Sequence, residues 1–410
     1  MALNFPDPAG QTPANTFSPT STPSATTNGV TYTWDGEKWV ANSVSVGSTA
    51  NLQQITDNGN TTSNDIITSG DIQATSFNGG QLSGMRNLVI NGDMRISQRG
   101  NVADINTTTN NYGGPDRFAL YSSSPSDSAV FSAIQESVTD VPGFKAAYRA
   151  DCTTAASGAL TGIEEIKILT IFEAANLQSL RCGYADAQQI TLSFWVRSNQ
   201  TGTGVIWFFR PDSVRHTSMT YTINAADTWE PKTLTVNADT TGIIPSDNGQ
   251  GLDISWVLDS GPDYTSGTAL NGTWEDVVDA NRYVGQTLDI GQSTDDYFDI
   301  TGVQLETGPV ATPFEYRPYG TELNLCQRYY YGRDRVQYFY GTSLSNGGCT
   351  VAIYHPVKMR RAPDVTDTAN YGPMEVTGDI KTYVFTRSKP VGGSQVDVSA
   401  DFAYTADAEL

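Results

Sequence analysis

Histidine is almost absent from this sequence, which has only His216 and His355 among its 410 residues. A multi-histidine metal centre and histidine-based acid–base catalysis are therefore disfavoured. Basic residues are also scarce, since 24 lysines and arginines are outnumbered by 44 aspartates and glutamates, for a net charge of -20. Such a surface repels a phosphate backbone, so nucleic acid is excluded as an expected partner.

Cysteine and long apolar runs are lacking as well. The four cysteines form no Cys-x-x-Cys pair, so neither a disulfide scaffold nor a zinc knuckle is expected. Sparse thiols of this kind are typical of a protein made in a reducing cytosol. No apolar run of about 18 residues is present, and the first residues, MALNFPDPAG, have neither the basic nor the apolar segment of a secretory signal. We therefore expect neither membrane insertion nor signal-directed secretion.

The chain is rich in the residues that strands and turns require. It has 38 glycines, 20 tyrosines and 7 tryptophans, and charged residues are only 17% of it. Strand interiors favour Thr, Val, Tyr and Trp, whereas turns favour Gly, Asn and Asp. This composition predicts an all-β protein, and the length predicts two to three domains.

The N-terminal region predicts an arm that carries one hairpin. The first 28 residues are of low complexity and should be extended or disordered alone. The stretch VTYTWDGEKWVA follows, and its Asp35-Gly36 pair suits a two-residue type I′ turn. One isolated hairpin is marginal in water, so its aromatic residues, Tyr32, Trp34 and Trp39, need a partner. That partner could be a neighbouring segment of this chain or a different scaffold protein.

Residues 46–85 predict a β-rich stalk. Short strands at 65–68 and 71–74 are separated by Gly or Asn, and no piece can bury an apolar face alone. Such sequence becomes stable when copies wrap around one another, which argues for a homo-oligomer, with three copies as the usual solution. A flexible linker is the alternative. The stalk is favoured because isoleucine and phenylalanine recur where a pure linker would carry only Gly and Ser.

The region from 86 to 320 predicts a two-sheet β-sandwich. Its strands recur every ten to twenty residues, at 129–138, 190–197, 204–209, 233–236, 252–258 and 298–305. The stretch ITLSFWVR alternates, which places Ile190, Leu192, Phe194 and Val196 inward. Residues 164–180 have helix-like spacing but could equally be a strand followed by a short helix.

The last region, 321–410, predicts a small all-β domain. A helical turn is expected at 322–328, and an aromatic strand pair at 329–331 and 338–340. Further strands are expected at 350–354, 376–380, 383–388 and 395–404. A strand that continues almost to the end suits a globular tip.

Several stretches resemble bacteriophage tail-fibre proteins, in particular those of short-tailed phages that infect marine cyanobacteria. NLVINGDMRISQRG at 87–100 resembles the opening of a recurring phage sandwich domain, and GPDRF at 114–118 follows it. LSFWVRSNQTGTG, NAADTWEPKTLTV and ITGVQLETGPVATPFEYRPYGTELNLCQRYYY continue the pattern to residue 331. NLQQITDNGNTTSNDI at 51–66 is similar to the stalk entry of phage fibres. The first 45 and the last 75 residues carry a weaker match.

The resemblance implies a structural virion protein that forms an intertwined homotrimer. It implies attachment of 1–45 to a tail, neck, adaptor or nozzle protein, with Tyr32, Trp34 and Trp39 as candidate contacts. It implies a stalk at 46–85, a jelly-roll-like, carbohydrate-binding sandwich at 86–320 and a receptor-facing tip at 321–410. Assembly in the host cytoplasm and release by lysis would place the protein in the virion.

Glycan binding requires flat aromatic faces for sugar C–H groups and polar groups for hydroxyls. The loop at 259–282 has this composition, and its candidate contacts are Tyr264, Trp274, Asp263, Asn271 and Asp276. The alternative is a surface loop with an aromatic residue pinned to the core or to a neighbouring subunit. At the tip, the candidates are Tyr330, Arg333 and Tyr338, with a core or interface role as the alternative. Trp207 with Arg210 and His216 is a further candidate, although its strand favours a core role.

No catalytic residue is assigned. A glycosidase needs two carboxylates about 5–9.5 Å apart, but 44 acidic residues make such pairs uninformative. No cofactor is expected, although Asp- and Asn-rich loops such as 246–253 could hold a structural Ca²⁺ as readily as they could form plain turns. The sequence thus predicts a fibre that adsorbs to host-surface polysaccharide by multivalent contacts. The alternatives are a non-receptor structural or decoration protein of the head or neck, and a glycan depolymerase.

Overall fold

A computed structural model of the chain divides it into two compact units, Met1–Gln73 and Ala74–Leu410. The structure describes residues 24–27, 30–34, 39–41, 85–123, 129–333, 348–367, 375–378, 382–388 and 404–410. The strands before residue 42 and those at 348–354, 375–378 and 382–388 are described by their backbone alone. No helix in these parts of the chain is long and apolar enough to cross a membrane. The predicted stalk and Tyr338 lie outside the described residues.

The N-terminal unit contains a three-stranded antiparallel sheet. Its strands are β1 (Ser24–Thr27), β2 (Val30–Trp34) and β3 (Trp39–Ala41), in that order. The predicted hairpin is present, but Trp34 pairs with Trp39, so four residues connect the strands. The two-residue turn predicted at Asp35-Gly36 lies outside the described residues. The expectation that the first 28 residues are extended or disordered alone stays a prediction, because only the strand β1, which pairs with β2, is described within them.

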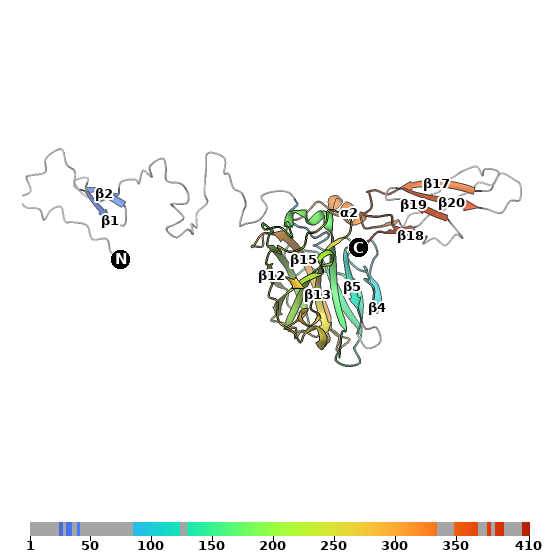
Figure 1. The fold of residues 1–410 in the computed structure, drawn as a ribbon, viewed down its shortest axis with the longest axis horizontal. Coiled ribbons are helices and arrows are strands. Elements are labelled where there is room, and N and C mark those ends of the chain that lie inside the picture. The colour runs from blue at the N-terminus through green and yellow to red at the C-terminus, as the bar shows by residue number, and fades with distance from the viewer. Residues whose placement is uncertain are drawn as a thin grey trace, which may run out of the picture. The chain divides into compact units, whose positions relative to one another are not determined.

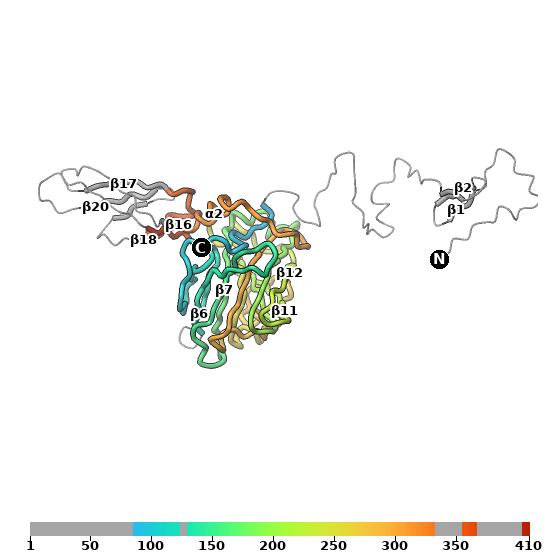
Figure 2. Tube along the Cα trace, turned by 180° about the vertical axis from the view of Figure 1, so that it is seen from behind, coloured from blue at the N-terminus to red at the C-terminus, as the bar shows by residue number. Residues whose placement is uncertain are grey.

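Two six-stranded antiparallel sheets form the sandwich of the second unit (Figures 1 and 2). Sheet I has the order β14 (Glu275–Asp276), β11 (Arg215–Ile223), β10 (Gly202–Arg210), β13 (Gln250–Ser260), β8 (Glu165–Glu173) and β5 (Phe118–Ser122). Sheet II has the order β12 (Glu230–Val236), β9 (Ile190–Ser198), β15 (Tyr297–Thr307), β7 (Ala146–Thr154), β6 (Val130–Ser137) and β4 (Val102–Ile105). All six strands predicted between residues 129 and 305 are confirmed.

The core lies between the two sheets, and the alternating side chains of β9 illustrate how it is formed. Ile190, Leu192, Phe194 and Val196 are each at most 4% exposed, as their alternation predicts. The Phe194 ring meets the Trp256 ring of sheet I edge to face, at 5.7 Å between centroids. The open question at 164–180 is also answered: strand β8 continues directly into the 3₁₀ helix η1 (Ala174–Leu180). Shorter 3₁₀ turns are η2 (Pro211–Ser213), η3 (Pro262–Tyr264) and η4 (Asp279–Asn281).

Three of the stretches that resemble phage fibres meet around Asn91. Its side-chain amide donates to the carbonyls of Ile96 (2.8 Å) and Asp116 (3.0 Å). Its backbone N–H donates to the Glu322 carboxylate at 2.6 Å. Asn91 is fully buried, so each bond satisfies a group that water cannot reach. Hydrogen bonds of Asn91 therefore join the segment that precedes the sandwich strands to helix-forming residues that follow them.

The exit leads through helix α2 (Tyr319–Gln327) into two small antiparallel sheets. One has the order β16 (Tyr330–Arg333), β21 (Tyr404–Asp407) and β18 (Asp364–Asp367). The other has the order β17 (Gly348–Tyr354), β20 (Thr382–Ser388) and β19 (Glu375–Gly378). The predicted strand at 338–340 and most of the one at 395–404 lie outside the described residues. The helical turn predicted at 322–328 is confirmed, with a start three residues earlier.

Ion pairs and a hydrogen bond join the C-terminal region of the chain to the sandwich. The Arg117 guanidinium, which is 2% exposed, pairs with Glu409. Arg99 pairs with Asp407 at 2.9 Å and with Glu409 at 3.2 Å. Arg360 donates to the Asn248 carbonyl at 2.7 Å. The last described residues thus pack against the sandwich, and the domain boundary between 320 and 321 stays a prediction.

Candidate functional site

An open groove runs over the outer face of sheet II and is called here the Trp195 groove. It has a volume of about 410 Å³. It is lined by Pro142, Phe144, Ser193, Phe194, Trp195, Pro231, Lys232, Thr233, Gly302, Ala311, Thr312, Pro313, Phe314 and Tyr316. Trp195 alternates with the inward residues of β9, so its side chain points away from the core. On this outer face the side chain is half-buried. Ser193 and Thr233 pair across β9 and β12 on the same face.

Three aromatic rings form one wall of the Trp195 groove. Phe144 and Phe314 meet edge to face at 5.0 Å between centroids, and Phe314 and Tyr316 at 4.9 Å. Phe144 is buried, whereas the Tyr316 side chain is 54% exposed. The cluster therefore anchors an aromatic ring in the sandwich and leaves its outermost member open to a ligand.

Two buried polar residues of β15 hold this wall in place. The Glu306 carboxylate accepts from the Thr312 backbone N–H (2.8 Å) and hydroxyl (2.7 Å). The Gln304 side chain donates to Glu306 at 2.9 Å and accepts from the Glu315 N–H at 2.8 Å. Because both side chains are at most 2% exposed, the segment 312–315 is fixed before any ligand arrives.

The candidate loop at 259–282 folds over the outer face of sheet I. Tyr264 is 8% exposed and meets Tyr283 edge to face at 5.4 Å. The Arg282 guanidinium lies 4.8 Å from the Tyr264 ring centre and 5.0 Å from that of Trp207. Trp274 is half-buried and donates its indole N–H to the Asn237 carbonyl at 2.9 Å. These aromatic rings are therefore engaged with the sandwich.

The polar candidates of the same loop are exposed, namely Asp263, Asn271 and Asp276. Asp276 pairs with Arg215 at 2.9 Å. Tyr264 and Trp274, the aromatic candidates of this loop, are buried and half-buried respectively, and glycan contact by this loop stays a prediction.

His216 lies beneath the loop in a fully buried position. Its Nδ1 accepts from the Trp207 indole N–H at 3.0 Å, and its Nε2 lies 3.2 Å from the Glu275 carboxylate. Burial lowers the pKa of His216, although Glu275 opposes the shift. Arg210 is equally buried and pairs with Asp239. These groups bond one another and stabilise the fold, in agreement with the core role favoured for Trp207.

At the tip, the predicted contacts lie beside the sandwich. The Tyr330 side chain is 8% exposed, and the Arg99 guanidinium covers its ring at 3.6 Å. Arg333 lies in β16, where it pairs with Tyr404. For Tyr32, Trp34 and Trp39 the structure describes only the strand backbone. Roles for these residues in glycan binding or virion attachment remain predictions.

Two carboxyl groups on the outer side of sheet I are poised to bind protons. Burial raises the pKa of Asp253 to about 7, although Lys167 opposes the shift. Burial and the neighbouring Asp289 carboxylate raise the pKa of Asp259 to about 7. Among the described residues, no three His, Cys, Asp or Glu side chains are grouped closely enough to hold a metal ion.

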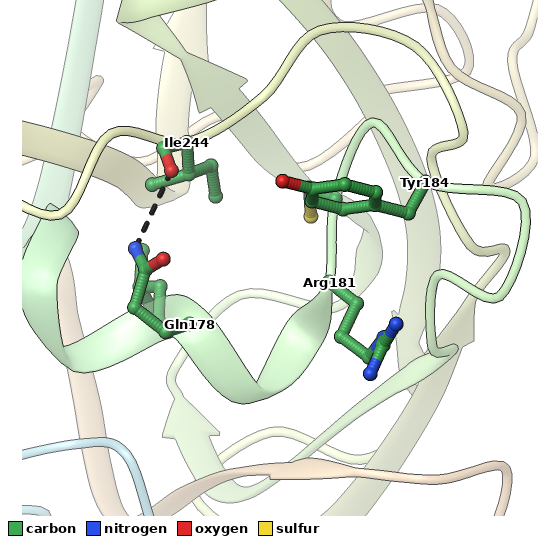
Figure 3. A pocket seen from close by; sticks show the side chains of 6 residues that line it. Gln178, Arg181, Tyr184 and Ile244 are labelled. Atoms are coloured by element: carbon green, nitrogen blue, oxygen red, sulfur yellow. Dashed lines mark hydrogen bonds between the residues drawn. The ribbon is translucent and has the colours of Figure 1, made fainter.

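A second hollow, the Tyr184 pocket, opens beside η1 (Figure 3) and has a volume of about 350 Å³. It is lined by Leu177, Gln178, Arg181, Cys182, Tyr184 and Ile244. Sequence reasoning missed both hollows. Trp195 carried a usable signal, because alternation placed a large aromatic residue on the outer face of a strand. Tyr184 lies in an irregular turn, where no periodic pattern marks it.

Comparison with known proteins finds only distant likenesses. No family model and no curated protein matches the chain. The enzymatically active domain of tailspike protein 4 of bacteriophage CBA120 is 11% identical over 54% of this chain, with a TM-score of 0.28. The family 11 carbohydrate-binding module of a Clostridium thermocellum cellulase is 11% identical over 52% of this chain and 99% of its own, with a TM-score of 0.24.

A third similar structure is the N-terminal cellulose-binding domain of a Cellulomonas fimi glucanase. It is 11% identical over 52% of this chain and 91% of its own, with a TM-score of 0.20. This chain spans 21% of the tailspike structure. The sandwich of the second unit has a distant likeness to carbohydrate-binding modules and to a phage tailspike domain, and no specific family is identified.

Proposed function

We propose that the sandwich binds a saccharide chain in the Trp195 groove. The observation that carries this proposal is the combination of an outward tryptophan, an exposed tyrosine and strand hydroxyls in one open hollow. Aromatic faces pack on the C–H groups of a sugar ring, and hydroxyl groups bond its edge. The groove's volume of about 410 Å³ lies within the range of roughly 300–1,000 Å³ that is usual for small-molecule sites.

The charges around the groove favour a neutral saccharide. Lys232 is paired with Glu230 at 2.6 Å. Arg197, beside Trp195 on β9, is shared between Asp299 (2.8 Å) and Asp140 (3.1 Å). Lys232 is the one cation among the described lining residues, and a net charge of -20 repels a carboxylate or sulfate.

Binding by the Trp195 groove is tested with the full chain and a panel of soluble neutral glucans, xylans, mannans and galactans. Trp195→Ala and Tyr316→Ala should each weaken the binding of at least one polysaccharide by about tenfold or more in calorimetric titration. Tyr319→Ala is the matched control, because Tyr319 is 55% exposed against 54% for Tyr316 and does not line the groove. Equal affinities for all four proteins, or no binding by the wild type, would contradict the proposal.

The wider role follows from the resemblance of residues 87–331 to phage tail fibres. We propose a non-enzymatic virion fibre that attaches by its N-terminal arm to a tail or neck protein and adsorbs to host polysaccharide. Three chains per fibre would multiply weak single-groove contacts into stable adsorption. A purely structural head or neck protein and a depolymerase remain the alternatives. The first would bind no polysaccharide, and the second would release reducing ends from it.

Light scattering of the purified full-length chain tests the trimer. We expect three times the mass of the 44.2 kDa chain. A second sample that comprises residues 86–410 locates the contacts: a trimer places them in the sandwich or tip, and a monomer places them within 1–85. A monomeric full-length chain would contradict the avidity argument and favour a decoration protein.

A further inference from the structure

The Tyr184 pocket is a second hollow that is separate from the Trp195 groove. It lies between η1 with its following turn and the loop that carries Ile244, and the two sites share no lining residue. Figure 3 shows Gln178 and Ile244 on one side of the hollow and Tyr184 on the other. What the pocket can bind follows from how each of these groups is held.

Gln178 is fixed so that its amide oxygen faces the hollow (Figure 3). Its side-chain nitrogen donates to the carbonyls of Ala174 (2.9 Å), Pro245 (3.1 Å) and Ile244 (3.4 Å). Only the NH₂ group of an amide can donate to carbonyls. The NH₂ group of Gln178 therefore points away from the hollow, and its carbonyl oxygen points into it. The pocket is thereby given an oriented hydrogen-bond acceptor without further reorganisation.

The opposite wall is the turn from Arg181 to Tyr184, and close packing fixes it too. Arg181 caps η1 in the left-handed conformation, with φ 53°. The Gly183 N–H donates to the Asp239 carbonyl at 2.9 Å. Gly183 has φ +84°, and a Cβ there would lie 2.6 Å from the Gly242 carbonyl oxygen, so the turn cannot move closer or carry a side chain at this position.

This turn presents an aromatic ring and a cation to the hollow. Tyr184 is 51% exposed, and its hydroxyl end points across the pocket towards Ile244 (Figure 3). The Arg181 guanidinium lies 5.9 Å from the Tyr184 ring centre and pairs with Asp186 at 2.7 Å. Because Asp186 balances this charge, the guanidinium acts as a hydrogen-bond donor more than as an anion site.

We propose that the Tyr184 pocket binds a single neutral sugar ring. The exposed tyrosine would pack on the C–H face of the ring, while Gln178 accepts from one hydroxyl and Arg181 donates to another. Leu177 and Ile244 add apolar groups to the lining. The volume of about 350 Å³ is near the lower end of the usual range of roughly 300–1,000 Å³, which suits one ring more than a chain.

The test uses the full chain and a panel of methyl glycosides of glucose, galactose, mannose and N-acetylglucosamine, observed by saturation-transfer NMR. We expect saturable binding of at least one glycoside, weakened about tenfold or more by Tyr184→Ala. Tyr319→Ala, at 55% exposure against 51%, is the matched control and should stay within about twofold.

Alkylation of Cys182 gives an independent measurement. Its half-buried thiol lines the pocket, whereas Cys152 is buried in the sandwich and Cys326 in helix α2. A bound glycoside should slow the alkylation of Cys182, followed by peptide mapping, and leave that of Cys152 and Cys326 unchanged. Glucuronic acid is included as a charged comparison and should protect less.

The outcomes separate this inference from the proposed function. Glycoside binding that Trp195→Ala abolishes and Tyr184→Ala leaves intact would overturn the pocket and support the groove. Absence of saturable binding up to tens of millimolar, or tighter binding of glucuronic acid than of every neutral glycoside, would also overturn it. Loss of glycoside binding in Tyr184→Ala together with protection of Cys182 would support it, whether or not the groove binds a chain.

Discussion

Replacing Glu173 with alanine is expected to lower the free energy of unfolding by about 3–5 kcal/mol. Glu173 is 2% exposed at the end of β8 and accepts hydrogen bonds from the Arg328 Nε (2.9 Å) and the Tyr329 hydroxyl (2.8 Å). The alanine would leave a largely buried guanidinium and a buried phenol without their partner. These two donors lie directly before β16, so the sandwich would also lose a contact with its C-terminal region.

The electrostatics of Glu173 add a dependence on pH. Burial alone would raise its pKa, but hydrogen bonds from Arg328 and Tyr329 outweigh it and hold the pKa of Glu173 below its ordinary value. The carboxylate therefore contributes stability above the pKa of the unfolded chain, and this contribution is lost as the pH falls through the lower, folded value. The difference between wild type and Glu173→Ala should accordingly shrink under acid conditions.

Urea unfolding followed by tryptophan fluorescence measures both effects. Asp364→Ala is the control, because Asp364 pairs with Arg361 at the surface with 79% of its side chain exposed. Exposed pairs of this kind contribute about 0–1 kcal/mol. A loss in Glu173→Ala no larger than that of the control would show that the buried network does not stabilise the fold.

Asp259→Asn should have the opposite effect and stabilise the protein at pH 8 by about 2–4 kcal/mol, since each pKa unit corresponds to about 1.4 kcal/mol. Burial and Asp289 raise the pKa of Asp259 to about 7, so the folded chain holds a proton that the unfolded chain releases near pH 4. Wild-type stability is therefore fully present below the unfolded pKa and falls as the pH rises through about 7. An asparagine can keep the bond from the Ser260 N–H, which measures 2.7 Å, and donate to Asp289 at every pH.

Unfolding midpoints from pH 5 to pH 8 test this expectation. The curve of Asp259→Asn should be flatter than that of the wild type and cross above it towards high pH. Asp295→Asn removes a carboxylate from an exposed turn of sheet II and serves as the control for net charge. Parallel curves for all three proteins would mean that Asp259 holds no proton near neutral pH.

The strands could be predicted because their signal is local. In β9, four inward residues alternate with outward ones, so the sequence alone predicts which side chains are buried. The same alternation pointed Trp195 outward, but nothing local shows that Phe314 and Tyr316, more than a hundred residues later, complete its groove. That closure depends on Gln304 and Glu306, whose outward polar side chains fasten the wall.

The aromatic candidates illustrate the limit of composition. Tyr264 and Tyr330 are in segments with the residues that a sugar site requires, but Arg282 and Arg99 cover their rings at 4.8 and 3.6 Å. Arg99 lies more than two hundred residues from Tyr330, so no window of sequence contains both.

The pairing of Arg333 with Tyr404 affects which part of the C-terminal region could be replaced by a different sequence. The chain leaves the β16–β21–β18 sheet after Arg333 and returns to it at Tyr404, which lies opposite Arg333 on the adjacent strand. Between these two points, β18 also pairs in the same sheet. The two stretches on either side of β18 pair with each other through β17 and β20. Strands β17 and β20 could therefore be exchanged together for a different hairpin, provided that Arg360 and its bond to Asn248 are kept, because doubling the length of a loop costs only about 0.6 kcal/mol when its ends stay fixed. The thermal unfolding of such a chimera would measure how independent this cassette is of the sandwich that carries it.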